Sequence, residues 1–132
     1  MHIEEVERYK VACHVSRKDL RLHGIMVEDL VNRTPLGRMF IGKASELSKD
    51  STEYDWPGCA FSMQMEFYPD DIILIFSERI DDYIYNLRQT EMTLPQEQAE
   101  EFGKMINLIS MSEEEEARRI IRNFEKNVRE IQ

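Results

Sequence analysis

Residues 59–77 read CAFSMQMEFYPDDIILIFS, and this stretch decides the fold of the chain. Over residues 59–67, inward and outward positions alternate with a period of two, which predicts a strand with one buried face. That face consists of Cys59, Phe61, Met63, Met65 and Phe67. Residues 72–76 are all large and apolar, which predicts a strand covered on both faces. The YPDD segment between them favours a turn, so we predict an antiparallel hairpin whose second strand is central in a sheet.

The N-terminal part of the chain predicts one further strand. Apolar residues alternate over residues 6–15, which we expect to form a strand with one buried face. Its inward positions are Tyr9, Val11, Cys13 and Val15. His14 falls on the opposite face, where exposure to solvent is a commoner role for histidine than binding a metal ion.

Three helical segments are predicted between the strands. Ser16 and Asp19 have the spacing of a capping box, which starts one helical turn that Gly24 ends in a left-handed conformation. A short helix follows over residues 27–32, and a longer helix runs from Pro35 to about residue 49 after a threonine cap. The longer helix is expected to cover the inward face of the hairpin with an apolar stripe. That stripe consists of Leu36, Met39, Phe40, Ala44, Leu47 and the aliphatic stem of Lys43.

The C-terminal part of the chain is predicted to be helical. Residues 78–92 fit either a short helix or an extended connector, and their periodicity leaves both open. Helices are predicted over about residues 94–110 and 113–131, the second starting at a capping pattern that opens with Ser112. Only two or three residues join them, so they form an antiparallel hairpin. Apolar residues of the second helix have coiled-coil-like spacing, and we predict a partner-binding seam there. Its residues are Ile120, Phe124, Val128 and Ile131.

Together these elements predict an α+β fold with two domains. A small antiparallel sheet in the order strand-helix-helix-strand-strand, with helices packed on it, accounts for residues 1–80. A C-terminal helical appendage accounts for residues 81–132. The unbroken apolar run in the second hairpin strand requires cover from both domains, because it leaves neither face of that strand polar.

The composition excludes several classes of protein. The formal charge of −9 is spread along the chain, which disfavours binding to nucleic acid and to anionic membranes. No apolar run reaches the length of a membrane helix, and the acidic first residues do not resemble a signal peptide, so we expect a cytoplasmic protein. Cys13 and Cys59 are then free thiols that act as small hydrophobic residues.

No catalytic or metal-binding pattern is evident in the sequence. The five glycines form no phosphate loop, and His2, His14 and His23 are far apart on different elements. A pair made by Cys13 or Cys59 with His23 is the catalytic alternative, although neither cysteine lies on a recognisable nucleophile elbow. We therefore expect no enzyme activity, no cofactor and no metal ion.

Residues 1–79 resemble the N-terminal domain of the MecA-type adaptors. The resemblance rests on the opening MHIEEV, on DLxxHGIxxEDL from Asp19 to Leu30, on Met39-Phe40, and on a Pro-Gly loop before the two-strand hairpin. These bacterial negative regulators of competence deliver target proteins to a Clp-type AAA+ unfoldase–protease. The resemblance implies that residues 1–79 bind a protein target. The helical hairpin occupies the place of the family's unfoldase-binding domain.

Two functions follow as expectations. The first is a non-enzymatic adaptor that recognises a regulatory target protein and contacts a Clp ATPase. The alternative is a structural protein that forms a homodimer through its C-terminal helices.

Overall fold

The computed structural model describes the backbone of residues 1–52 and 62–131 and the side chains of residues 1–52 and 62–126. The chain divides into two compact units, Met1–Glu78 and Arg79–Gln132. We call them the α/β unit and the helical unit, and we describe each by itself. Predictions for Cys59 and Phe61 lie outside the described residues.

The α/β unit contains a four-stranded antiparallel sheet in the order β1-β2-β4-β3. Its elements are β1 (His2–Glu7), β2 (Lys10–Ser16), α1 (Arg17–Leu22), α2 (Val27–Val31), α3 (Pro35–Asp50), β3 (Ser62–Phe67) and β4 (Asp71–Ser77). The predicted hairpin is present, and its second strand, β4, is central: Leu74 lies opposite Cys13 of β2 and Met65 of β3. The α+β class is therefore confirmed.

The single strand expected over residues 6–15 is wrong, because β1 and β2 form a hairpin there. Its turn contains Tyr9 at φ 64°, a left-handed conformation that a large side chain rarely adopts. The backbone N–H of Glu78 donates to the Tyr9 carbonyl at 2.8 Å, and the Arg8 guanidinium lies 5.2 Å from the centre of the Tyr9 ring. The element order is consequently strand-strand-helix-helix-helix-strand-strand.

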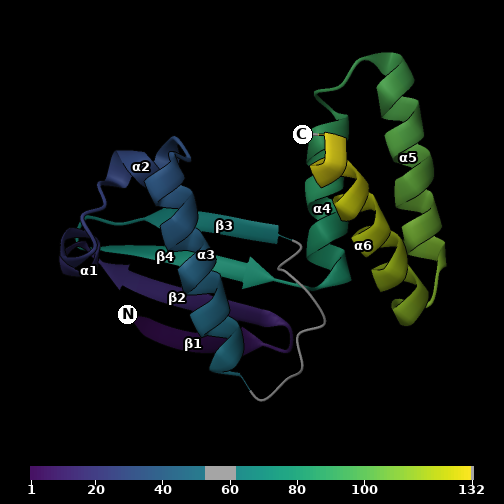
Figure 1. The fold of residues 1–132 in the computed structure, drawn as a ribbon. Coiled ribbons are helices and arrows are strands. Elements are labelled where there is room, and N and C mark those ends of the chain that lie inside the picture. The colour runs from purple at the N-terminus through teal and green to yellow at the C-terminus, as the bar shows by residue number, and fades with distance from the viewer. Residues whose placement is uncertain (53–61, 132) are drawn as a thin grey trace. The chain divides into compact units, whose positions relative to one another are not determined.

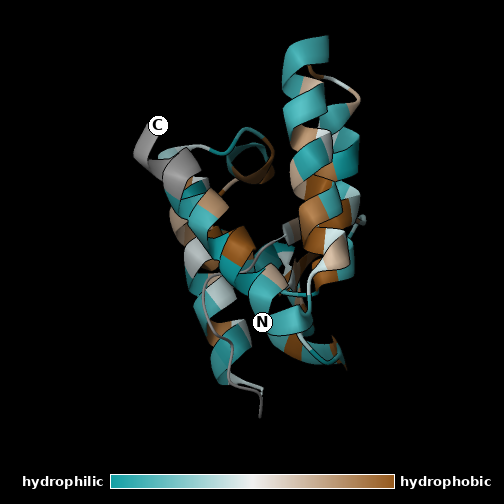
Figure 2. Cartoon of the chain, turned by 90° about the vertical axis from the view of Figure 1, so that its right-hand side faces the viewer, coloured by the Kyte–Doolittle hydropathy of each residue, from teal (hydrophilic) through white to brown (hydrophobic). Residues whose placement is uncertain are grey.

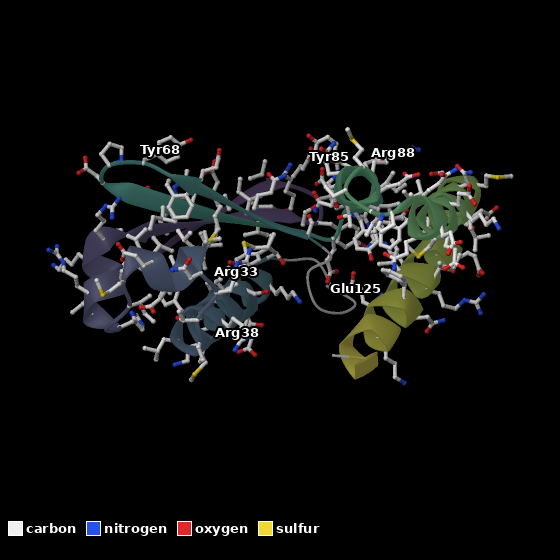
Figure 3. The ribbon with its side chains drawn as sticks, turned by 90° about the horizontal axis from the view of Figure 1, so that it is seen from above. Arg33, Arg38, Tyr68, Tyr85, Arg88 and Glu125 are labelled. Atoms are coloured by element: carbon white, nitrogen blue, oxygen red, sulfur yellow. The ribbon has the colours of Figure 1, made fainter. Side chains whose placement is uncertain are left out.

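The core of the α/β unit lies between the sheet and helices α1, α2 and α3, which pack on the same face (Figure 1). Figure 3, which views the sheet along its edge, shows all three helices on one side of it. The buried residues of this core are Cys13, Val15, Leu20, Ile25, Leu30, Phe40, Ala44, Ile72, Leu74 and Phe76.

The inward face of α3 differs from the predicted stripe. Gly37, Phe40, Ala44 and Ser48 are buried, whereas Leu36, Met39 and Leu47 are 53%, 61% and 46% exposed. A close contact with α2 determines which side of α3 faces the sheet. A Cβ atom on Gly37 would lie 2.0 Å from the Asp29 carbonyl oxygen, so that only glycine fits where the two helices meet.

The two faces of β4 are also less alike than expected. Ile72, Leu74 and Phe76 point toward the helices and are buried, but Ile73 and Ile75 are only half-buried on the opposite face. In the described part of the α/β unit, helices lie on one face of the sheet alone (Figure 3). At the end of β3, Phe67 was predicted to point inward and is 45% exposed.

The helical unit contains the two predicted helices, α5 (Gln96–Met111) and α6 (Glu114–Ile131), and before them α4 (Ile80–Glu91), where the sequence left a helix and an extended connector open. Figure 2 shows brown hydrophobic and teal hydrophilic residues mixed along the helices, as expected for amphipathic elements. The buried apolar residues are Tyr83, Leu87, Ile106, Ile109, Ala117 and Ile121.

The junction between α5 and α6 corrects one predicted cap. Ser112 was expected to start α6, but its hydroxyl donates to the Leu108 carbonyl at 2.7 Å and its N–H to the Ile109 carbonyl at 3.3 Å. Ser112 therefore ends α5, and α6 begins at Glu114. The short connection between these two helices is as predicted.

Candidate functional site

The start of α1 is fixed by the predicted capping box. The Asp19 N–H donates to Ser16 Oγ at 3.0 Å, and the Ser16 N–H donates to Asp19 Oδ2 at 3.1 Å. Gly24 adopts φ +66°, as predicted for the residue that ends this helix. The Ile25 N–H then donates to the Leu20 carbonyl at 2.9 Å and brings two buried side chains together under the turn.

Asp29 joins α2 to α3. Its Oδ2 accepts from the Met26 N–H at 2.9 Å, and its Oδ1 accepts from the Thr34 hydroxyl at 2.8 Å. At the start of α3, the Gly37 N–H donates to Thr34 Oγ1 at 3.2 Å. Through these bonds Asp29 holds both helix N-termini in register, which is a structural role rather than a chemical one.

These carboxylates make the fold sensitive to acid. Hydrogen bonds from backbone N–H groups, those of Ser16 and Met26, hold the pKa values of Asp19 and Asp29 below their ordinary value. A lowered pKa in the folded state contributes stability above the unfolded pKa, and this contribution is lost as pH falls through the folded value.

We therefore expect the urea midpoint of the α/β unit to fall between about pH 5 and pH 2, and to fall less in an Asp19→Asn/Asp29→Asn variant. That variant should be the less stable protein at pH 7, because an amide lacks the negative charge that is favourable near a helix N-terminus. Urea titrations at each pH, followed by the NMR signals of amides in the α/β unit, make the comparison. Equal pH dependence of the two proteins would contradict it.

The DLxxHGIxxEDL motif leaves exposed apolar side chains at its variable positions. Leu20, Ile25 and Leu30 are buried, and the two aspartates are caps. Between them, Leu22 is 74% and Met26 65% exposed. Val31, at the end of α2, is 55% exposed. We name Leu22, Met26 and Val31 the corner surface, because large apolar side chains exposed close together in the sequence are candidates for a docking site.

Three large apolar side chains of α3 are also exposed, but they do not form one surface. Leu36, Met39 and Leu47 are 53%, 61% and 46% exposed. With 3.6 residues per turn, Leu36 and Leu47 lie beside the buried Phe40, whereas Met39 lies further round the helix, toward Gly42. The Gly42 position is open, since a Cβ atom there would meet nothing within 4 Å. The amphipathic pattern assigned the three large residues to the core.

The helical unit contains an apolar pocket of about 280 Å³ between α5 and α6. Its lining residues are Leu94, Gln98, Glu101, Phe102, Met105 and Phe124. The rings of Phe102 and Phe124 meet edge to face, with centres 5.8 Å apart. Predicted seam residue Phe124 therefore contributes to a concave surface. Most of the lining comes from α5. The broad apolar stripe of this helix was the sequence feature that could have predicted the pocket.

The other predicted seam residues are not brought to this pocket by the described structure. Ile120 is half-buried and does not line the pocket. The side chains of Val128 and Ile131 lie outside the described residues. Of the four predicted residues, Phe124 is thus the one for which the structure shows a place in a possible binding surface.

Tyr83 ties α4 to α6 in the helical unit. Its hydroxyl donates to Glu125 Oε1 at 2.6 Å, and the residue is 3% exposed. Burial, followed by the hydrogen bond to Glu125, raises the pKa of Tyr83 far above its ordinary value. The phenol therefore remains protonated and acts as a buried hydrogen-bond donor.

The histidines and the described cysteine have structural surroundings. His14 lies 3.2 Å from Glu4 and 3.5 Å from Asp71, across three strands of the sheet. Among the described residues, no group of three or more His, Cys, Asp or Glu side chains could hold a metal ion. Cys13 is fully buried, and burial raises the pKa of its thiol, which disfavours the reactive thiolate.

His23 is engaged at the end of α1. Its Nδ1 lies 2.9 Å from the Asp19 carbonyl oxygen, and its ring meets the Phe40 ring edge to face at 5.5 Å. These contacts orient the imidazole along the α1–α3 boundary. They give it a packing role in the α/β unit.

No protein-family model matches the chain, and comparisons with curated proteins and with solved structures find no similar protein. Within the described residues, none of the helices is both long and apolar enough to cross a membrane.

Proposed function

We propose that the chain is a non-enzymatic, cytoplasmic adaptor whose α/β unit binds a protein target through the corner surface. The observation that carries this proposal is the exposure of Leu22, Met26 and Val31 in a segment whose other large apolar residues, Leu20, Ile25 and Leu30, are buried. Burying a large apolar side chain contributes roughly 1.5–3 kcal/mol, so covering these three side chains favours association with a partner.

The capped turns make the corner surface suitable for recognition. Asp19 and Asp29 fix both helix starts, and Gly24 fixes the turn between them. The three exposed side chains are therefore presented on an ordered backbone. A partner loses less conformational entropy in binding such a surface than in ordering a loose segment.

The resemblance to MecA-type adaptors defines the first class of target to test. It covers the α/β unit and makes a substrate of a Clp-type protease the proposed partner. The helical unit would then supply the contact with the ATPase.

A photocrosslinking experiment tests the corner surface. A photoreactive amino acid placed at Leu22 or Met26 of the full chain is expected to capture the same protein from lysate of the native host. A matched probe at Leu108, which is 55% exposed on α5, should not capture it. The captured protein is then purified and titrated by calorimetry.

We expect Leu22→Asp to weaken binding of this purified protein about 10-fold or more, since about 1.4 kcal/mol corresponds to a factor of ten. Leu108→Asp should bind as the unmodified chain does. Both residues are exposed, so the unfolding midpoints should change little. Equal binding by all three proteins, or identical crosslinks from residues 22 and 108, would contradict the proposal.

Self-association through the helical unit is a second candidate function. The observation that favours it is the apolar pocket, in which Phe102 and Phe124 present aromatic rings beside Met105. Gln98 lies at this pocket and is exposed, so Gln98→Arg places a charge there without disturbing the core. A dimer that Gln98→Arg abolishes in sedimentation would support this second function.

A further inference from the structure

The two outer strands of the sheet differ in how they meet solvent. β1 and β3 are the edge strands, and among the described residues no further strand pairs with either (Figure 1). β1 contains Glu4, Glu5 and Glu7, and its register is irregular between the last two. Charged side chains and bulges are common devices that keep other chains from pairing with a sheet edge. β3 has the sequence SMQMEF, with a regular register and one charged residue, so this edge lacks that protection.

The pairing of β3 with β4 determines which backbone groups of β3 face the open edge. Tyr68 and Asp71 exchange both backbone hydrogen bonds, at 2.8 and 3.4 Å, and close the hairpin. Hydrogen-bonded and non-hydrogen-bonded pairs alternate along an antiparallel ladder, so Phe67, Met65 and Met63 form non-hydrogen-bonded pairs with β4. The N–H and C=O groups of these three residues therefore point away from β4, toward the edge.

The side chains of the same three residues lie on the helical face of the sheet. Met63, Met65 and Phe67 lie opposite residues of β4 that point toward the helices. Met63 and Met65 are half-buried against the core, and Phe67 is 45% exposed. A strand added beside β3 would place every second side chain next to these three and cover their exposed parts. The edge therefore favours a strand with apolar side chains at alternate positions.

The opposite face of β3 supplies a charge. Ser62, Gln64 and Glu66 point away from the helices, and Glu66 is the charged residue among them. The Tyr68 hydroxyl donates to Glu66 Oε2 at 3.4 Å, and Figure 3 shows Tyr68 on this side of the sheet. A basic side chain directly opposite Glu66 would pair with its carboxylate, whereas an acidic one would be repelled. The formal charge of −9 also disfavours a second copy at this edge.

We propose that the edge of β3 binds an extended segment of a partner protein as an added antiparallel strand. The segment has apolar side chains opposite Met63, Met65 and Phe67 and a lysine or arginine opposite Glu66. In an antiparallel arrangement each of the three apolar residues exchanges two backbone hydrogen bonds with the segment. These bonds provide affinity, and the alternate side chains provide specificity. The corner surface takes no part, so this inference does not depend on the proposed target binding.

A synthetic peptide tests this arrangement without any change to the protein. The probe is acetyl-Thr-Val-Lys-Val-Thr-Val-Thr-amide, whose lysine lies opposite Glu66 when its three valines lie opposite Phe67, Met65 and Met63. We expect it to bind the full chain with a Kd below about 1 mM. The NMR signals of the Met63, Met65 and Phe67 amides should shift most, because their N–H groups gain hydrogen bonds to the peptide.

Methylation of single peptide nitrogens separates strand addition from other modes of binding. In the proposed register the N–H of the central valine donates to the Met65 carbonyl, whereas the lysine N–H points away from β3. Methylation of the central valine nitrogen should weaken binding about 10-fold or more, since about 1.4 kcal/mol corresponds to a factor of ten. Methylation of the lysine nitrogen should leave binding unchanged. The two peptides differ only in the position of the methyl group.

Two variants of the chain locate the contact. Met65→Pro removes an N–H from the open edge and none from the ladder with β4, and proline is tolerated at such positions of edge strands. It should weaken peptide binding about 10-fold or more while the β4 amides keep their protection from hydrogen exchange. Glu66→Lys should weaken binding about 3- to 5-fold, and a peptide with glutamate in place of lysine should recover that loss.

Four results would overturn the inference. The first is a probe that does not bind the full chain at concentrations up to about 5 mM. The second is equal binding by the two methylated peptides, and the third is a set of largest shifts at β1 instead of β3. The fourth is a chain that dimerises through β3 without the peptide, because a second copy would then be the occupant of this edge.

Discussion

Replacement of Leu74 by alanine is expected to lower the free energy of unfolding of the α/β unit by about 2–5 kcal/mol. Leu74 is fully buried at the centre of β4, between Cys13 on β2 and Met65 on β3. Its side chain fills the core under α3. The flanking strands β2 and β3 are hydrogen-bonded to β4, so they cannot close the space left by a smaller side chain without losing those bonds. A cavity therefore remains, and its cost adds to the lost burial.

Hydrogen exchange of the β4 amides measures this effect in the right unit. The chain has two compact units, so a single unfolding transition observed for the whole protein need not report on β4. Ile73→Ala is the matched control: it removes atoms from the neighbouring position, which is half-buried on the other face. Its effect should be smaller than that of Leu74→Ala. A loss below about 0.5 kcal/mol for Leu74→Ala would mean that β4 is not a central strand.

The hairpin of β3 and β4 could be predicted because its signals are local. Residues 72–76 are apolar without interruption, and the YPDD segment supplies a turn before them. The spacing of Ser16 and Asp19 is likewise sufficient to predict the start of α1. In each case, neighbouring residues are sufficient to determine the structure, and the prediction depends on no distant contact.

The β1–β2 hairpin could not be predicted in the same way. Its turn contains Arg8 and Tyr9, without the glycine, asparagine or proline that usually marks such a turn. Tyr9 adopts its left-handed conformation where the N–H of Glu78, nearly seventy residues later, donates to its carbonyl. A contact so distant in sequence leaves no trace in the local pattern.

The orientation of α3 and the nature of residues 78–92 depended on packing. The apolar residues of α3 are spread over more than half of its circumference, so periodicity alone did not determine which of them face the sheet. The Gly37 contact with Asp29 decides this, and Leu36, Met39 and Leu47 remain exposed. In α4, burial of Tyr83 and Leu87 within the helical unit selects the helix over the extended connector.

The candidate surfaces were predicted less well than the fold, for a related reason. The regular apolar spacing in α6 predicted a seam there, whereas two residues of the corner surface, Leu22 and Met26, occupy positions that the motif leaves variable. Leu22 and Met26 become conspicuous only when their neighbours are seen to be buried. Exposure is a property of the folded chain, and the sequence pattern reports it poorly when several faces are apolar.

The same substitution at two glycines of α3 should have opposite effects on stability. Gly37→Ala is expected to lower the free energy of unfolding by about 3 kcal/mol, because its methyl group would lie 2.0 Å from the Asp29 carbonyl oxygen. The α2 and α3 helices would have to separate, which also strains the hydrogen bond between Thr34 and Asp29.

Gly42→Ala is expected to raise the free energy of unfolding by about 0.5–1 kcal/mol, since its methyl group enters open space and alanine favours helix. Both variants should be measured by hydrogen exchange of the β4 amides, which reports on the α/β unit by itself. Because the two residues lie five positions apart in one helix, differences in helix propensity cancel between them. Destabilisation by both substitutions would show that the surroundings of Gly42 are closely packed. Stabilisation by both would show that α2 and α3 are further apart than their contact at Asp29 indicates.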